Sequence, residues 1–234
     1  NEVVGLDVSW IEGDLEDTDS LRRLIDGADT LIHCAGAVRG ASRTHFNRVN
    51  VDGTARLVKL AVDQHLKPNF LLISSLAARE PHLSPYAASK HGGEEVLVEK
   101  SDNLFWTVFR PPAVYGPGDR ELMPLFYWMK RGIAPILGSG NARFSLLFVE
   151  DLVDAIVQWL DRKKTPGCTY ELHDGQPGGY SWHDVIDTVA GLRQGKPVAS
   201  IKIPLVVVKL ISTLNLATAR ALGYAPMLTP GKVH

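Results

Sequence analysis

The sequence has no surplus of charge of one sign. Its 25 lysines and arginines balance 26 aspartates and glutamates, and the formal net charge is −1. Proteins that bind nucleic acid or an anionic membrane usually carry a strong basic surplus. The composition therefore argues against both kinds of partner, and a small-molecule substrate is expected.

Cysteines and long hydrophobic runs are also scarce. Cys34 and Cys168 lie far apart in apolar surroundings, which predicts buried thiols in a reducing, cytoplasmic compartment and no disulfide framework. The most apolar stretch, residues 203–222, is interrupted by Pro204 and Lys209. We therefore expect a helix docked on the core and no membrane span.

The chain lacks the glycine-rich turn that follows the first strand of a dinucleotide-binding sheet. Residues 3–6 and 8–11 both have the apolar composition of strands. Parallel strands, however, need a crossover of about a dozen residues between them. We therefore expect that residues are missing before the first residue and after Asp7, and that the far end is clipped as well.

Strand-like and helix-like segments alternate along the rest of the chain, as in α/β proteins with a largely parallel, doubly wound sheet. The apolar runs predict strands at 30–34, 70–73, 105–109, 144–149 and 170–172. The helical spacing predicts helices at 17–25, 51–64, 85–100, 121–130, 150–160, 182–192 and from 205 onward, with a turn at 138–140.

Tyr86 and Lys90 lie four residues apart in a predicted helix, downstream of the pair Ser74-Ser75. Residues four apart share one face of a helix, and a nearby cation would lower the pKa of the phenol from its ordinary value of about 10. Such a phenol can move a proton to or from a carbinol or carbonyl oxygen. The pair predicts acid–base chemistry beside a hydride carrier, and a solvated helix pair is the alternative.

Seven short motifs occur in one order along the chain. They are Gly13-Asp14-Leu15, the strand ending in Ala35-Gly36, Asn50 with Gly53-Thr54, Ser74-Ser75, the Tyr86/Lys90 pair, Arg110-Pro111-Pro112 with Tyr115-Gly116-Pro117, and Phe148 to Leu152. In this order they resemble the extended short-chain dehydrogenase/reductases, also called the NAD-dependent epimerase/dehydratase family. The resemblance implies a Rossmann-like domain over 1–116 and 149–174, and a small substrate-binding domain over 117–148 and 175–234.

The resemblance also implies a catalytic trio. Ser75 would hydrogen-bond the reacting oxygen, with Ser74 as the rival for this role. Tyr86 would be the acid and base, and Lys90 its electrostatic partner, which also holds the nicotinamide ribose. Tyr115 and Arg143 are further candidates for contact with the substrate, with a core aromatic and a surface arginine as the respective alternatives.

Cofactor contacts are implied at several positions. They are Asp7, Asp14, Leu15, Ala35, Gly36, Asn50, Tyr86, Lys90 and Pro112. If Asp7 ends a strand, its carboxylate can bind a ribose 2′-hydroxyl and repel a 2′-phosphate, so NAD is favoured over NADP. Two of these residues have structural alternatives, Asp14 as a turn residue and Asn50 as a helix N-cap. The histidines show no metal-site spacing.

Three functions follow from these motifs. The first is an NAD(P)-dependent oxidoreductase or epimerase acting on a secondary alcohol or ketone, with a nucleotide sugar as one candidate substrate. The second is a dehydrogenase or reductase of a steroid-like or other hydrophobic ketone, favoured by the short spacing from Ser75 to Tyr86 and by Phe144. The third is a non-catalytic dinucleotide-binding regulator. The resemblance also implies a homodimer formed through the helices at 51–64 and 85–100.

Overall fold

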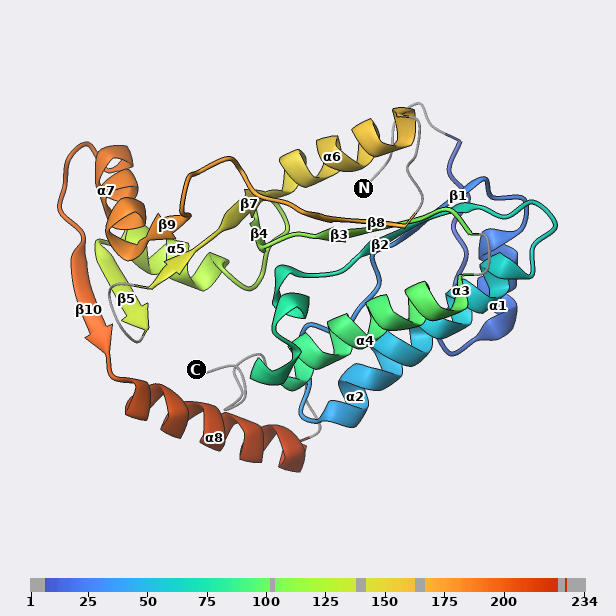
Figure 1. Cartoon of the computed structure of the whole chain (residues 1–234). Helices are drawn as coiled ribbons and strands as arrows, with labels where there is room; N and C mark the ends of the chain where they lie inside the picture. The colour runs from blue at the N-terminus through green and yellow to red at the C-terminus, as the bar shows by residue number, and fades with distance from the viewer. Residues whose placement is uncertain (1–6, 102–103, 138–141, 163–166, 223–225, 227–234) are drawn as a thin grey trace.

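The computed structural model describes residues 7–101, 104–137, 142–162, 167–222 and 226 (Figure 1). Its largest sheet has four parallel strands in the order β1-β2-β3-β8. The strands are Thr30–His33 (β1), Asn69–Ile73 (β2), Trp106–Arg110 (β3) and Cys168–Glu171 (β8). Their short apolar runs are those of strands buried between helices.

Helices cover both faces of this sheet (Figure 1). The helices α1 (Thr18–Ile25), α3 (Gly53–Val62) and α4 (Pro85–Lys100) lie on one face, and α6 (Val149–Asp161) lies on the other. This arrangement is the Rossmann-like, doubly wound α/β fold, as the sequence predicted.

Apolar side chains fill the space between the sheet and the first group of helices. Val58, Phe70 and Leu97 are completely buried there, and burial of such side chains is the main stabilising contribution to a fold of this kind. On the opposite face, the indole N–H of Trp159 in α6 donates to Oγ1 of Thr107 in β3 at 3.0 Å.

The predicted helix over 51–64 forms in part. The structure has α2 (Arg43–Asn47), a π-helical turn at Arg48–Asp52, and then α3. Such turns occur often at functional sites. A β-carbon added to Gly93 of α4 would lie 2.6 Å from the carbonyl oxygen of Asn50, so glycine is what lets α4 approach this turn.

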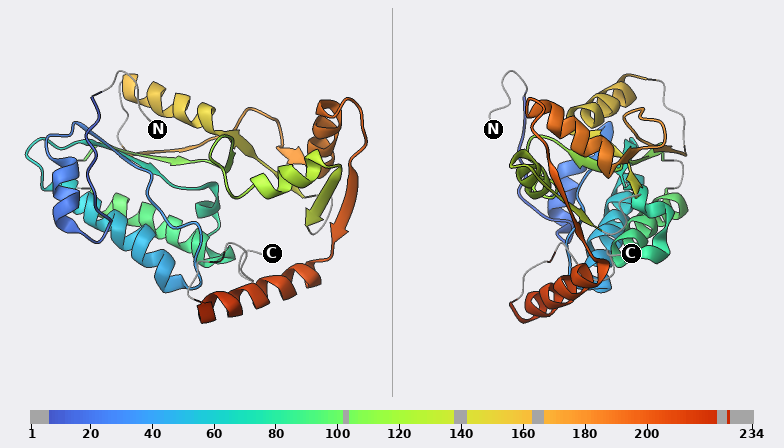
Figure 2. Two further views of the ribbon diagram at one scale, coloured as in Figure 1. Left: turned by 180° about the vertical axis from the view of Figure 1, so that it is seen from behind. Right: turned by 90° about the vertical axis from the view of Figure 1, so that its left-hand side faces the viewer.

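A smaller group of elements lies beyond the carboxyl ends of the central strands (Figure 2). It contains α5 (Met123–Lys130), β5 (Ile133–Leu137), α7 (Trp182–Leu192) and β10 (Ala199–Ile203), with β10 parallel to β5. Its own core is built around the fully buried Met129. The predicted domain boundaries remain a prediction.

The strand predicted over 144–149 is wrong as a single element. It is divided into β6 (Arg143–Phe144) and β7 (Leu146–Phe148), which have different partners. β6 pairs with β9 (Tyr180–Ser181) and β7 with β4 (Ala113–Tyr115).

The expectation of a docked core helix at the end of the chain is also wrong. In α8 (Leu205–Leu222), the side chains of Val206, Leu210 and Leu214 are 78%, 62% and 59% exposed. Only part of the helix surface, including Val208 and Ser212, is buried. Among the described residues, no helix combines the length and the apolar character needed to cross a membrane.

Two further expectations need correction. Residues 8–11 form no strand, and Trp10 is 85% exposed, because no neighbouring strand pairs with their backbone groups. Cys34 is exposed and Cys168 half-buried, so neither is the buried thiol that was expected. The strand expected at 3–6 and the turn at 138–140 lie outside the described residues.

Candidate active site

The carboxyl ends of β1, β2 and β3 open onto a cavity of about 820 Å³. Parallel strands end at the same edge of a sheet, and ligands of open α/β folds bind at that edge. Five of the residues that the sequence singled out line this cavity, namely Gly36, Ser75, Tyr86, Lys90 and Pro112. The tertiary fold therefore brings together residues from four separate segments.

Tyr86 owes its position to the way α4 begins. The hydroxyl oxygen of Ser84 accepts a hydrogen bond from the N–H of Ala87 at 3.0 Å, and Pro85 occupies the first helical position. Both are favoured helix starts. They place Tyr86 in the first turn, where its ring packs edge-on against Phe46 with 6.0 Å between centroids.

The expected lowering of the pKa of Tyr86 by Lys90 is wrong in direction. Burial raises the pKa of Tyr86 above its ordinary value of 10.0, and a side-chain hydrogen bond with Ser75 opposes this rise. Removing a phenolate from water disfavours the charged form. At neutral pH the phenol therefore holds its proton.

Lys90 lies one helical turn after Tyr86, and its ammonium donates to the carbonyl oxygen of Ile73 at 2.9 Å. Burial lowers the pKa of Lys90 from 10.5 to about 8, while the charges of Glu94 and Cys34 oppose that fall. Lys90 is therefore mostly protonated at pH 7.

The two serines both contact α4, but at different levels of the helix. The hydroxyl of Ser74 is buried and donates to the carboxylate of Glu94. The side chain of Ser75 forms the hydrogen bond with Tyr86, and its oxygen also accepts from the N–H of Ala77 at 3.2 Å. Ser75, the preferred candidate, thus makes the contact with the phenol.

Asn50 is not the helix N-cap that the alternative reading proposed. It is buried inside the π-helical turn, where its Oδ1 accepts from Ala37 N–H at 2.7 Å. Its Nδ2 donates to Ala37 O at 3.0 Å and to Ser89 Oγ at 2.8 Å. Asn50 therefore ties the loop after β1 to α4, beside the cavity.

Four of the implied cofactor residues, Asp7, Asp14, Leu15 and Ala35, are not among the residues that line the cavity. Asp14 Oδ1 accepts from the N–H groups of Glu16 and Asp17 at 2.6 and 3.0 Å, which is the turn role of an aspartate. Leu15 packs against the core of the large sheet. Asp7 and Ala35 are exposed. Their cofactor contacts remain predictions.

The two further substrate candidates, Tyr115 and Arg143, make contacts elsewhere. Tyr115 packs against Phe126 and Phe148, with ring centroids 6.1 and 5.5 Å away. Arg143 donates from Nε to Gly178 O at 2.6 Å and from Nη2 to Gly179 O at 2.7 Å. Neither is part of the cavity lining described above.

One buried residue at the site was missed from the sequence. Glu94 follows Lys90 by four residues on α4, is 5% exposed, and forms an ion pair with Arg110 at 2.6 Å. The spacing of four was a signal that it shares a helix face with Lys90. Within the described ranges, no group of three or more histidine, cysteine or acidic side chains could hold a metal ion.

Comparisons with known proteins bear on this arrangement. The model of a family described as the NAD dependent epimerase/dehydratase family matches residues 1–172. A ceramide reductase of Caulobacter vibrioides is 38% identical over 82% of this chain and 59% of its own length. A 3beta-hydroxysteroid-dehydrogenase/decarboxylase of Arabidopsis thaliana is 27% identical over 97% of this chain and 46% of its own length. The chain thus spans about half the length of these curated relatives.

Solved structures share the fold. A UDP-glucuronic acid 4-epimerase from Bacillus cereus, in complex with UDP-glucuronic acid and NAD, matches with a TM-score of 0.70 at 21% identity. The match covers 82% of this chain and 67% of that one. MoeE5, in complex with UDP-glucose and NAD, matches with a TM-score of 0.69 at 22% identity, over 83% of this chain and 71% of that one.

Proposed function

The chain belongs to the NAD-dependent epimerase/dehydratase family, and on that basis we propose that it is an NAD-dependent oxidoreductase or epimerase acting on a secondary alcohol or ketone. The observation that carries the proposal is the hydrogen bond between Ser75 and Tyr86 at the cavity wall, with Lys90 one helical turn behind. Two neighbouring hydroxyls at the cavity wall could both bind one substrate oxygen, as proton transfer to that oxygen requires.

The residues around the cavity fit a dinucleotide. A β-carbon on Gly36 would lie 3.1 Å from Asn50 Oδ1 and 3.6 Å from Lys90 Nζ. The glycine therefore leaves bare backbone at the cavity wall, where a cofactor can approach closely. Gly36 and Lys90 would hold the nicotinamide end of NAD, which when bound supplies a hydride acceptor or donor.

Each residue of the trio has a task in this proposal. Ser75 donates a hydrogen bond to the reacting oxygen, and Tyr86 donates its proton to a carbonyl or takes one from a hydroxyl. The positive charge of Lys90 stabilises the phenolate that is left after donation. Because burial keeps the proton on Tyr86 at neutral pH, the free site is in the state that reduces a carbonyl.

The lining of the cavity favours an apolar substrate over a nucleotide sugar. Apolar side chains from several elements contribute to it, namely Val38, Leu76, Leu83, Leu122, Phe144 and Leu152. The acidic side chains in the lining are Glu80 and Glu121. Glu121 is paired with Arg39 at 2.6 Å, and Glu80 would repel a diphosphate. Two relatives are named for ceramide and steroid substrates. We therefore place a hydrophobic ketone ahead of a nucleotide sugar.

A non-catalytic regulator remains the third candidate function. It would need the cavity to bind the dinucleotide without proton transfer. The contact between Ser75 and Tyr86 speaks against it, because binding alone does not require a buried phenol aimed at a reacting oxygen.

Replacement of the phenol tests the proposed function. Tyr86→Phe should abolish substrate-dependent oxidation of reduced nicotinamide with ceramide-like or steroid-like ketones, because the proton donor is lost. Tyr127→Phe is the control, since Tyr127 is a half-exposed tyrosine of α5. Unchanged turnover in Tyr86→Phe would disprove the assignment. Turnover with nucleotide sugars alone would favour the epimerase candidate.

A further inference from the structure

We propose that Glu94 is a positioning residue of this site: it holds Ser74 on one side and balances the charge of Lys90 on the other. The inference rests on the proposed function of the Ser75–Tyr86–Lys90 trio. It assigns a task to a buried carboxylate that this function leaves unexplained.

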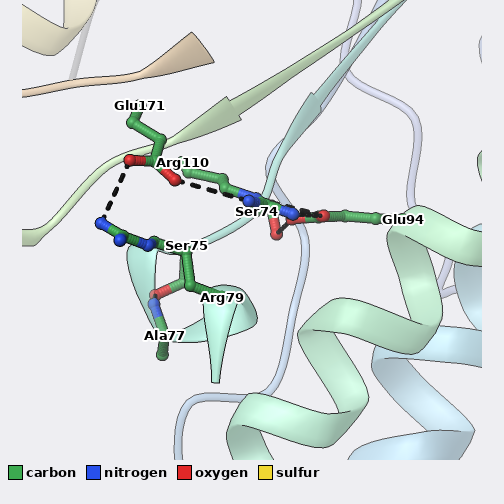
Figure 3. A network of polar contacts seen from close by, with 7 residues as sticks. All are labelled: Ser74, Ser75, Ala77, Arg79, Glu94, Arg110 and Glu171. Carbon is green, nitrogen blue, oxygen red and sulfur yellow. Dashed lines mark hydrogen bonds and ion pairs between the residues drawn. The ribbon is translucent and has the colours of Figure 1, made fainter. Parts of the chain in front are cut away.

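The carboxylate of Glu94 is held from two directions (Figure 3). Arg110 donates from Nε to Oε1 and Oε2 at 3.0 and 3.2 Å, and from Nη2 to Oε2 at 2.6 Å. Ser74 donates to Oε1 from the end of β2. The side chain of Glu94 is 7% exposed and that of Arg110 is 19% exposed. A pair removed from water in this way stays ionised only when its charges and hydrogen bonds are satisfied.

The bond to Ser74 acts on the next residue. The backbone N–H of Ser74 donates to Phe109 O at 2.8 Å, and that of Leu76 donates to Pro111 O at 2.8 Å. The bond to Glu94 then ties Ser74 to α4, two helical turns after Tyr86. Because Ser75 is the next residue of the chain, this bond helps to hold Ser75 beside the phenol.

The charge of Glu94 acts on Lys90. The other titratable groups that face Lys90 are Tyr86 on α4, and His33 and Cys34 where β1 ends. Burial raises the pKa values of Tyr86 and Cys34 and lowers that of His33 to about 4, so all three are neutral at pH 7. Among the groups that oppose the effect of burial on the pKa of Lys90, Glu94 has the largest electrostatic effect.

The charges continue outward in alternating sign. Arg110 also contacts Glu171 at the end of β8 at 3.5 Å, and Glu171 pairs with Arg79 at 3.2 Å (Figure 3). The outer pair is about half exposed, so solvent screens it and it contributes little. Of these charged residues, the inner pair, Glu94 and Arg110, is the part that acts on the site.

Two variants separate the two tasks of Glu94. Glu94→Gln keeps the shape and removes the charge, so the pH at which Lys90 is half-deprotonated should fall by about one unit. Labelling of Lys90 by an amine-reactive reagent, followed by mass spectrometry across a pH series, measures this directly and requires no turnover. Ser74→Ala removes the hydrogen bond and keeps the charge, so kcat should fall several-fold while the labelling midpoint stays in place.

Glu95→Gln is the matched control, because Glu95 is the next residue of the same helix and is exposed. A labelling midpoint in folded Glu94→Gln equal to that of the parent overturns the proposal. If Glu94→Gln does not fold, Ser74→Ala decides, and an unchanged kcat overturns it. A shifted midpoint together with full activity in Tyr86→Phe would instead reject the proposed function and keep the electrostatic role of Glu94.

Discussion

Gly93 is the position where local and tertiary preferences oppose each other most clearly. It lies inside α4, where alanine is more favourable than glycine by about 1 kcal/mol. A β-carbon at this position would lie 2.6 Å from the carbonyl oxygen of Asn50 and 3.6 Å from Oγ1 of Thr54. The nearest atom belongs to the backbone, so it cannot rotate away.

The free-energy cost of the steric clash with Asn50 should exceed the gain in helix propensity from alanine. Overpacking of this kind costs about 1–3 kcal/mol, and here it also displaces the π-helical turn that carries Asn50. We expect Gly93→Ala to lower the free energy of unfolding by about 1–2 kcal/mol. In a chain of this size the melting temperature should then fall by about 2–8 °C.

Gly191→Ala is the matched control for this substitution. Gly191 also lies in a helix, α7, but no atom would lie within 4 Å of its added β-carbon. The control should therefore stabilise the protein by up to about 1 kcal/mol. Thermal and urea denaturation of both variants compare the two effects. Equal stabilisation by both substitutions would refute the claim that α4 and the π-helical turn are in tight contact.

Three further predictions concern Asn50, Lys90 and the proposed dimer. Asn50→Ala leaves the N–H and the carbonyl of Ala37 without their side-chain partner, so urea denaturation should show a loss of about 1–3 kcal/mol. Lys90 has a pKa of about 8 in the folded protein and an ordinary value of 10.5. Between these values the unfolded chain binds more protons, so stability should rise with pH, and Lys90→Met should lack this rise. The dimer through α3 and α4 remains a proposal: Val98 of α4 is 55% exposed, and Val98→Asp should convert a dimer to a monomer in sedimentation. A parent that sediments only as a monomer would reject the dimer.

Much of the fold was predictable because its signals are local. The helix at 85–100 was predicted with its observed bounds, since Ser84 and Pro85 are a strong helix start. The strands β1, β2, β3 and β8 were predicted to within two residues at either end, because short apolar runs between helical segments indicate buried parallel strands. The strand expected at 8–11 does not form, because an apolar run becomes a strand only where another strand pairs with it.

The sequence by itself determined the family, the alternation of strands and helices, and the spacing that puts Tyr86 and Lys90 on one face of a helix. These depend on order and periodicity along the chain. Only the tertiary structure decided that burial raises the pKa of Tyr86, that Arg143 donates to Gly178 and Gly179, and that Glu94 joins Ser74 to Arg110. Burial and contacts between segments far apart in the chain depend on how the strands and helices pack, which no local pattern specifies.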